Sequence, residues 1–159
     1  MKCSIFFILS IFFLVSCNKD KYTSAPQITF KSINPNVWIS DNTSQTDGPI
    51  LSLHLTDAEG DFGFQVGEDT SYVYLKTYLN NEPISNYDAD DSLEFPDLTG
   101  IDRKNLSVDV NVLLNQAFVF SSRPRPFVDT LTFDVYVKDF GKNKSNVIRT
   151  STPVYYFSP

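Results

Sequence analysis

Apolar and polar residues alternate along most of this chain with a period of two. In the stretch 50–56, Leu51, Leu53 and Leu55 are separated by polar side chains, as expected of a strand with one buried face. No stretch shows convincing helical periodicity, and no internal repeat is visible. We therefore predict an all-β fold, an antiparallel sandwich of about seven strands. The alternating stretches are 27–33, 50–56, 71–79, 106–115, 130–139 and 146–157.

Two stretches lack this alternation, and one strand is interrupted. The segment 82–104 is long and acidic, and 118–128 contains two Arg-Pro pairs. Both are predicted to be loops. In the last stretch, Pro153 cannot donate a backbone hydrogen bond, so a break or bulge is expected there.

The amino terminus has the pattern of an export signal. Lys2 precedes an apolar run, 5–15, that is shorter than the ~20 residues a membrane span needs. The next residues, Leu-Val-Ser-Cys at 14–17, resemble the lipobox of bacterial lipoproteins, which implies acylation of Cys17. The predicted organisation is a signal peptide at 1–16 that is removed, a lipid-anchored tether at 17–26, and a single β-sandwich domain at 27–159.

The charge and the cysteine content of the chain exclude some classes of partner and a disulfide-stabilised fold. The chain has 13 basic and 19 acidic residues and a net charge of −6. Nucleic acid and anionic lipid surfaces require clustered Lys and Arg, so neither is expected as a partner. The only cysteine besides Cys17 is Cys3, which lies in the signal peptide. No disulfide framework is expected in the mature chain.

An acidic loop follows the stretch 50–56. Asp57, Glu59 and Asp61 recur at every second residue, with glycines at 60 and 63. Carboxylates this close repel one another unless water screens them or a cation joins them. In a sandwich of this kind the loop falls at the same end as Asp139, so Asp57, Glu59, Asp61 and Asp139 are candidate calcium ligands.

Three alternatives to calcium remain open for this loop. The carboxylates can be solvated by water, or they can pair with Lys142 and Lys144. Asp57 can also cap its own turn by accepting hydrogen bonds from nearby backbone N–H groups.

Catalytic signatures are weak, and we predict a protein that is not an enzyme. The single histidine, His54, falls on the polar face of a strand. The sequence contains no nucleophile elbow, phosphate-binding loop or zinc-ligand cluster. Trp38, Tyr155 and Tyr156 are open to two interpretations, a sugar-stacking face or ordinary packing.

Two stretches resemble a known class of proteins. Residues 130–146, Thr-Leu-Thr-Phe-Asp-Val-Tyr-Val-Lys-Asp-Phe-Gly-Lys-Asn-Lys-Ser-Asn, resemble the final hairpin of bacterial Ig-like and cadherin-like domains, although Lys142 separates the Gly and Asn of their usual turn. Residues 55–63, Leu-Thr-Asp-Ala-Glu-Gly-Asp-Phe-Gly, resemble a loop of Bacteroidota envelope lipoproteins, a family with no settled activity.

This resemblance implies a location and a broad role. It implies a surface or envelope lipoprotein held in the membrane, most simply the outer membrane, through acylated Cys17. Its Ig-like module would bind or support an envelope protein or a glycan of unknown identity. The alternative is an accessory subunit of a surface uptake or secretion complex.

Overall fold

The computed structural model describes residues 22–39, 48–63, 70–84, 91–95, 104–114 and 124–159. The predicted signal peptide, Cys17 and the first part of the tether lie outside these residues. None of the described residues belongs to a helix with the length and hydropathy needed to cross a membrane.

The described part of the chain contains ten strands, and each strand belongs to one of two sheets. The all-β prediction is thereby confirmed, and the arrangement is consistent with a sandwich. The strands are β1 (Gln27–Asn34), β2 (Val37–Ile39), β3 (Ile50–Asp57), β4 (Tyr72–Leu79), β5 (Glu82–Pro83), β6 (Asp91–Glu94), β7 (Leu106–Leu113), β8 (Phe127–Lys138), β9 (Ile148–Arg149) and β10 (Val154–Ser158).

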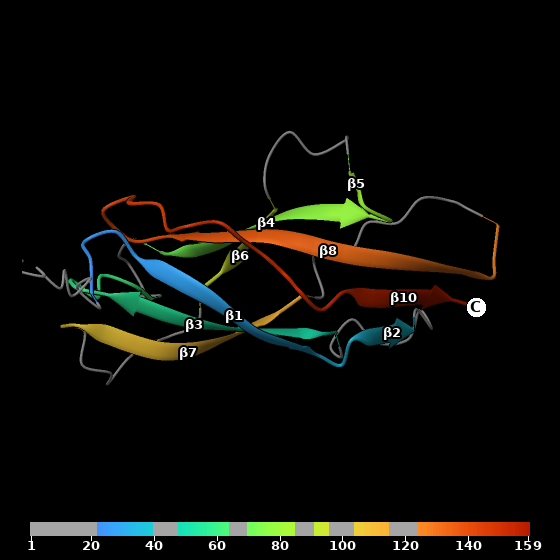
Figure 1. The fold of residues 1–159 in the computed structure, drawn as a ribbon, viewed down its shortest axis with the longest axis horizontal. Coiled ribbons are helices and arrows are strands. Elements are labelled where there is room, and N and C mark those ends of the chain that lie inside the picture. Colours follow the sequence, from blue (N-terminus) through green and yellow to red (C-terminus); the bar gives the residue numbers. More distant parts are fainter. Residues whose placement is uncertain (1–21, 40–47, 64–69, 85–90, 96–103, 115–123) are drawn as a thin grey trace, which may run out of the picture.

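The two sheets differ in size. The three-stranded sheet has the order β1-β3-β7, and the seven-stranded sheet has the order β2-β10-β8-β4-β5, with β6 also paired to β4 and β9 to β8. In Figure 1, β1, β3 and β7 form one layer, and β4 and β8 lie side by side in the other. The long strand β8 is central to its sheet, because β4 lies on one side and β9 and β10 share the other.

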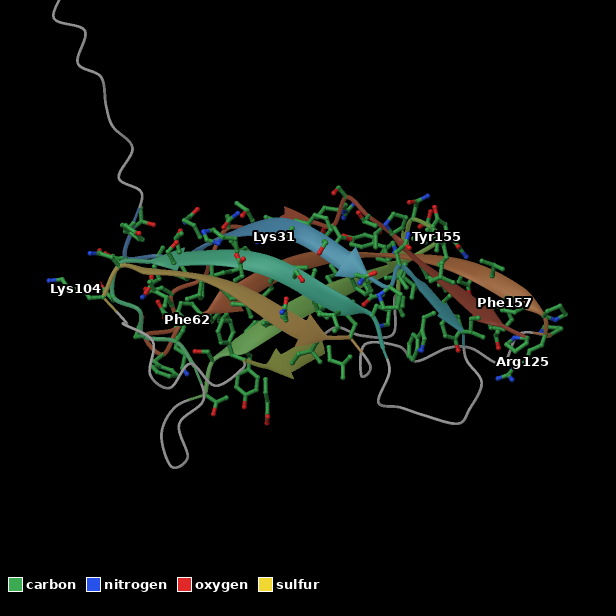
Figure 2. The ribbon with its side chains drawn as sticks, turned by 90° about the horizontal axis from the view of Figure 1, so that it is seen from below. Lys31, Phe62, Lys104, Arg125, Tyr155 and Phe157 are labelled. Carbon is green, nitrogen blue, oxygen red and sulfur yellow. The ribbon has the colours of Figure 1, made fainter. Side chains whose placement is uncertain are left out.

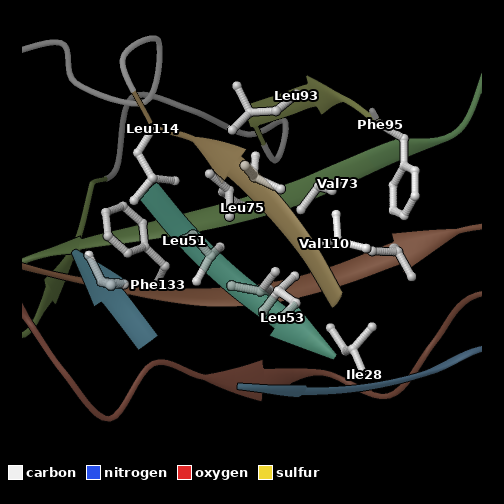
Figure 3. Packing of buried hydrophobic residues seen from close by; sticks show 14 of the residues in the cluster. Ile28, Leu51, Leu53, Val73, Leu75, Leu93, Phe95, Val110, Leu114 and Phe133 are labelled. Carbon is white, nitrogen blue, oxygen red and sulfur yellow. The ribbon is translucent and has the colours of Figure 1, made fainter. Parts of the chain in front are cut away.

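The core lies between the sheets and follows the alternation of the sequence. Leu51, Leu53 and Leu55 of β3 are at most 1% exposed, and Val73 of β4 and Phe133 of β8 are fully buried. Figure 3 shows Leu51 and Leu53 of β3 facing Val73 and Phe133 of the other sheet. Burial of an aliphatic or aromatic side chain of this size contributes about 1.5–3 kcal/mol, so the core is the main source of stability.

The structure corrects both loop predictions and adds one strand that was not predicted. The segment 82–104 contains β5 and β6, and β6 pairs with β4 because Leu93 and Phe95 turn into the core. Within 118–128, β8 already begins at Phe127. The short β2 was not predicted, and its pairing with β10 is parallel, so the sandwich is not wholly antiparallel. The break near Pro153 is confirmed, because β9 ends at Arg149 and β10 begins at Val154.

Where the chain after β8 is not in a continuous strand, side chains accept hydrogen bonds from backbone N–H groups of β8. Ser145 and Thr150 accept hydrogen bonds through their hydroxyl oxygens from the backbone N–H groups of Val137 and Phe133, at 3.0 and 3.1 Å. Asn146 reaches the other sheet: its Oδ1 accepts from the N–H of Ile28 at 2.8 Å, and its Nδ2 donates to the carbonyl of Ile28 at 2.9 Å. This amide therefore joins the two sheets along one edge.

Replacing Asn146 with Ala is expected to lower the free energy of unfolding by about 1–2 kcal/mol, because both backbone groups of Ile28 lose their partners. Urea denaturation measures the effect. The matched control is Asn111→Ala, which removes an amide from the exposed face of β7 and should cost about 0.5 kcal/mol or less. Equal losses in the two variants would contradict the bridging role of Asn146.

Candidate metal centre

Three aspartates from two distant parts of the chain meet at one end of the sandwich. Asp57 is the last residue of β3, Asp61 lies in the loop after it, and Asp139 directly follows β8. One carboxylate oxygen from each lies within 4.8 Å of the others. Asp57 and Asp139 are at most 1% exposed. The predicted proximity of the loop to Asp139 is confirmed.

Backbone hydrogen bonds tie the loop after β3 to the turn after β8. The carbonyl of Asp61 accepts from the N–H of Phe140 at 2.9 Å, and its Oδ2 accepts from the N–H of Gly141 at 3.1 Å. A Cβ at Gly141 would stand 3.1 Å from the Asn143 amide nitrogen and 3.3 Å from an Asp139 oxygen. A larger residue at Gly141 would therefore crowd the side chains of its own turn, which orient Asp139.

Each of the two buried aspartates is oriented by its own turn. The Asp57 Oδ2 accepts from the N–H of Gly60, so the predicted capping of its own turn does occur. Gly60 has a φ of 66°, a conformation that favours glycine. Asp139 accepts from the backbone N–H of Asn143 at 2.7 Å and from its side-chain amide at 2.8 Å. These contacts hold the carboxylates in place without supplying a positive charge.

A buried aromatic residue anchors the loop after β3 in the core. Phe62, next to Asp61, is fully buried, and its ring centroid lies 5.2 Å from that of Phe95. In Figure 2, Phe62 lies toward the end of the molecule where Lys104 is found, and Tyr155 and Phe157 lie toward the opposite end. The loop also contacts the start of the domain, because the N–H of Ala58 donates to the carbonyl of Thr23 at 3.1 Å.

The three carboxylates lack a counter-charge among the described residues. The salt bridges found there are Lys31–Asp109, His54–Asp109 and Arg149–Asp134, all elsewhere in the fold. Burial, followed by the nearby charges of Asp61, Asp139 and Glu59, raises the pKa of Asp57 above its ordinary value, even though the hydrogen bond from Gly60 acts in the opposite direction. A bound cation would remove this electrostatic cost.

Two carboxylate oxygens at this centre are buried and have no hydrogen-bond partner. They are Asp57 Oδ1 and Asp61 Oδ1, whereas the Oδ2 atoms of both residues accept backbone N–H groups. Buried polar atoms are rarely unpaired, because an unmade hydrogen bond costs about 1–3 kcal/mol and more for a charged group. These two oxygens are therefore available to coordinate a metal ion.

The separation of the three aspartates is compatible with a shared divalent cation. Calcium binds oxygens at about 2.3–2.6 Å, so two of its ligands lie at most about 5 Å apart. The carboxylate oxygens all lie within 4.8 Å of one another, which is inside that limit. Backbone carbonyls and water would supply the remaining calcium ligands.

Other predicted members of the site lie outside this group. Glu59 is exposed and is not one of the three clustered carboxylates. Lys144 does not pair with the acids; its Nζ lies 3.7 Å from the centroid of the Tyr136 ring. Lys142 is exposed and has a φ of 66° in the turn after β8, and it forms no ion pair with a described residue.

The outer face of the smaller sheet carries a polar cluster that sequence analysis did not anticipate. His54 Nδ1 lies 2.8 Å from Asp109 Oδ1, and His54 Nε2 lies 3.4 Å from the Ser107 hydroxyl. The connectivity is that of a Ser-His-Asp triad. However, the serine contact is long for a hydroxyl hydrogen bond. Asp109 is also shared with Lys31, and its side chain is 52% exposed. We therefore interpret this cluster as cross-strand pairing on a solvated face.

Of the three aromatic residues considered as a sugar-stacking face, two pack against each other and one is exposed. Trp38 contacts Tyr156 edge-on, with centroids 5.6 Å apart, and Tyr156 is only 5% exposed. These two rings pack at the end of the sandwich opposite the metal centre. Tyr155 is 43% exposed beside Val37 and Ile39 of β2. The packing interpretation therefore holds for Trp38 and Tyr156.

Removing the Phe62 anchor is expected to destabilise the acidic loop and the whole fold. Phe62→Ala should lower the free energy of unfolding by about 3–5 kcal/mol, because it leaves a cavity under the loop. Phe62→Leu, which preserves more volume, should cost about 1.5 kcal/mol. Urea denaturation measures both, with Phe157→Leu at the far end as the control. A loss below about 0.5 kcal/mol in both Phe62 variants would show that the anchor is not needed.

No protein-family model matches this chain, and no curated protein matches it. Among solved structures, the CooA pilin subunit from enterotoxigenic Escherichia coli is similar, with a TM-score of 0.33 and 7% sequence identity, over 84% of this chain and 97% of the pilin.

Proposed function

We propose that this chain is a lipid-anchored, non-catalytic module of the bacterial cell envelope, with an Ig-like sandwich stabilised by one calcium ion. The observation that carries the calcium assignment is the set of three clustered aspartates with two unpaired buried oxygens. The ion would join the loop after β3 to the turn after β8 and so hold one end of the sandwich closed. This arrangement supports a structural role for the module in the envelope, or a role in binding another envelope component.

The membrane anchor in this proposal comes from the amino-terminal sequence. An apolar export signal ends at Cys17 within a lipobox-like stretch, and acyl chains on that cysteine would supply a lasting hold on the membrane, at about 0.8 kcal/mol per buried CH₂ group. The placement in the outer membrane, and any exposure on the cell surface, belong to the same proposal.

Calcium should raise the melting temperature of the protein, because it binds only the folded state. A hundredfold excess over the dissociation constant adds about 2.7 kcal/mol, which corresponds to several degrees in a domain of this size. Magnesium should act weakly, because it demands near-octahedral geometry and gives up its bound water reluctantly. Differential scanning calorimetry with chelator, with calcium and with magnesium measures the three states.

Two variants of the same loop sharpen this experiment. Asp61→Asn and Glu59→Gln each remove one negative charge, but only Asp61 belongs to the cluster. Asp61→Asn should lose most of the calcium response, and Glu59→Gln should retain it. Identical melting curves in chelator and in excess calcium for the wild-type protein would refute the calcium assignment.

Replacing Cys17 with Ser should prevent acylation and release the protein from the membrane fraction or leave it as an uncleaved precursor. Metabolic labelling with a fatty acid, followed by membrane fractionation, measures both effects. The lipoprotein assignment is wrong if the wild-type protein takes up no label and the Cys17→Ser variant stays with the membranes as fully as the wild type.

A further inference from the structure

Positive charge gathers on the outer face of the larger sheet, although the chain as a whole is acidic. Lys76 of β4 and Lys138 of β8 face outward there, and Lys144 and Arg149 reach the same face from the segment after β8. Its described carboxylates are Asp134 and Glu94, the latter opposite Tyr72. This face is therefore net positive, in contrast to the net charge of −6 for the chain.

Three of these cations form no ion pair with a described residue, although Lys76 stands opposite Asp134 across the strands and helps to lower the pKa of that carboxyl. Arg149 forms a two-point contact with Asp134, at 2.7 and 2.8 Å. That contact, followed by the hydrogen bond from Tyr78, lowers the pKa of Asp134, so the pair stays ionised and its charges cancel. Lys76, Lys138 and Lys144 form no ion pair with a described residue. Their charges are available to an anionic ligand.

Tyrosine rings organise the lysines on this face. Tyr74 and Tyr136 are cross-strand neighbours whose rings stack 4.8 Å apart at 6°. Lys144 lies 3.7 Å from the Tyr136 centroid, and Lys138 lies 4.9 Å from that of Tyr74. Cation–π contacts of this kind hold a lysine in position at little energetic cost. We call these residues, together with Lys76, the tyrosine–lysine face.

We propose that the tyrosine–lysine face binds an acidic polysaccharide, with its lysines paired to uronate carboxylates and the Tyr74 phenol hydrogen-bonded to a sugar hydroxyl. The face is flat sheet, and Lys76 stands four residues along the strands from Lys138, which is roughly 13 Å. An extended chain with repeated carboxylates can contact both positions at once.

The arrangement of the side chains argues against other polyanions. Nucleic acids bind open grooves through stacking of bases on exposed aromatic faces, but here Tyr74 and Tyr136 cover one another. A lipid surface would require apolar side chains beside the lysines, whereas the exposed apolar residues Val37, Ile39 and Val128 lie with Tyr155 around β2 and β10. An acidic peptide offers carboxylates but few hydroxyl groups for the tyrosines.

Hyaluronan oligosaccharides are a suitable probe, and the full chain in mild detergent is the protein to test by calorimetric titration. The wild-type chain should bind hyaluronan, should not bind neutral dextran, and should lose affinity as salt rises. The variant Lys138→Gln with Lys144→Gln should bind at least about tenfold more weakly. The charge-matched control, Lys31→Gln with Lys104→Gln, alters lysines outside this face and should stay within about twofold of wild type.

Several results would overturn the proposal. One is the absence of hyaluronan binding by the wild-type chain at low salt, and another is equal weakening in the two double variants. Binding to polyphosphate as tight as binding to hyaluronan would also reject it, because such binding requires no sugar. Melting curves of both double variants confirm that any loss of affinity occurs in folded protein.

Discussion

Mutual repulsion among buried carboxylates is the constraint that governs one end of this molecule. The strands β3 and β8 end at the same side of the sandwich, and a backbone hydrogen bond ties the loop after β3 to the turn after β8. This arrangement brings together Asp57, Asp61 and Asp139. Hydrophobic burial of Phe62 enforces that approach. Without a counter-charge the arrangement opposes folding. With a bound divalent cation it becomes a clamp between two segments that are far apart in sequence.

Two groups of like charges occupy different parts of the described surface. Three aspartates meet at one end of the sandwich, and three lysines lie on the tyrosine–lysine face. Lys144 links the two regions in sequence: it lies close to Asp139 along the chain, yet its side chain packs on Tyr136 and not on the acids. This segregation leaves the aspartates in need of a cation from solution and leaves the lysines able to contact an external anion.

Much of the fold could be predicted from the sequence, because alternation identifies strands with one buried face. The proximity of Asp139 to the loop after β3 followed from the same reasoning. Glu59 was placed in the candidate site because it continues the spacing of Asp57 and Asp61. The chain, however, bends at Gly60, which has a φ of 66°, so that regular spacing does not persist and Glu59 is exposed.

Other features had no local signal in the sequence. Leu93 and Phe95 alternate within an acidic run, which concealed β6, and β2 is only three residues long. The tyrosine–lysine face combines Lys76 with Lys138 and Lys144, which come together only through the pairing of β4 with β8 and the bridge between Lys138 and Lys144. Isothermal titration of the metal-free protein with calcium is the most direct test of the proposed calcium site. One ion should bind per chain, and none should bind to an Asp57→Asn, Asp61→Asn variant. No binding to the wild-type protein, or equal binding to that variant, would show that the three aspartates do not form a calcium site.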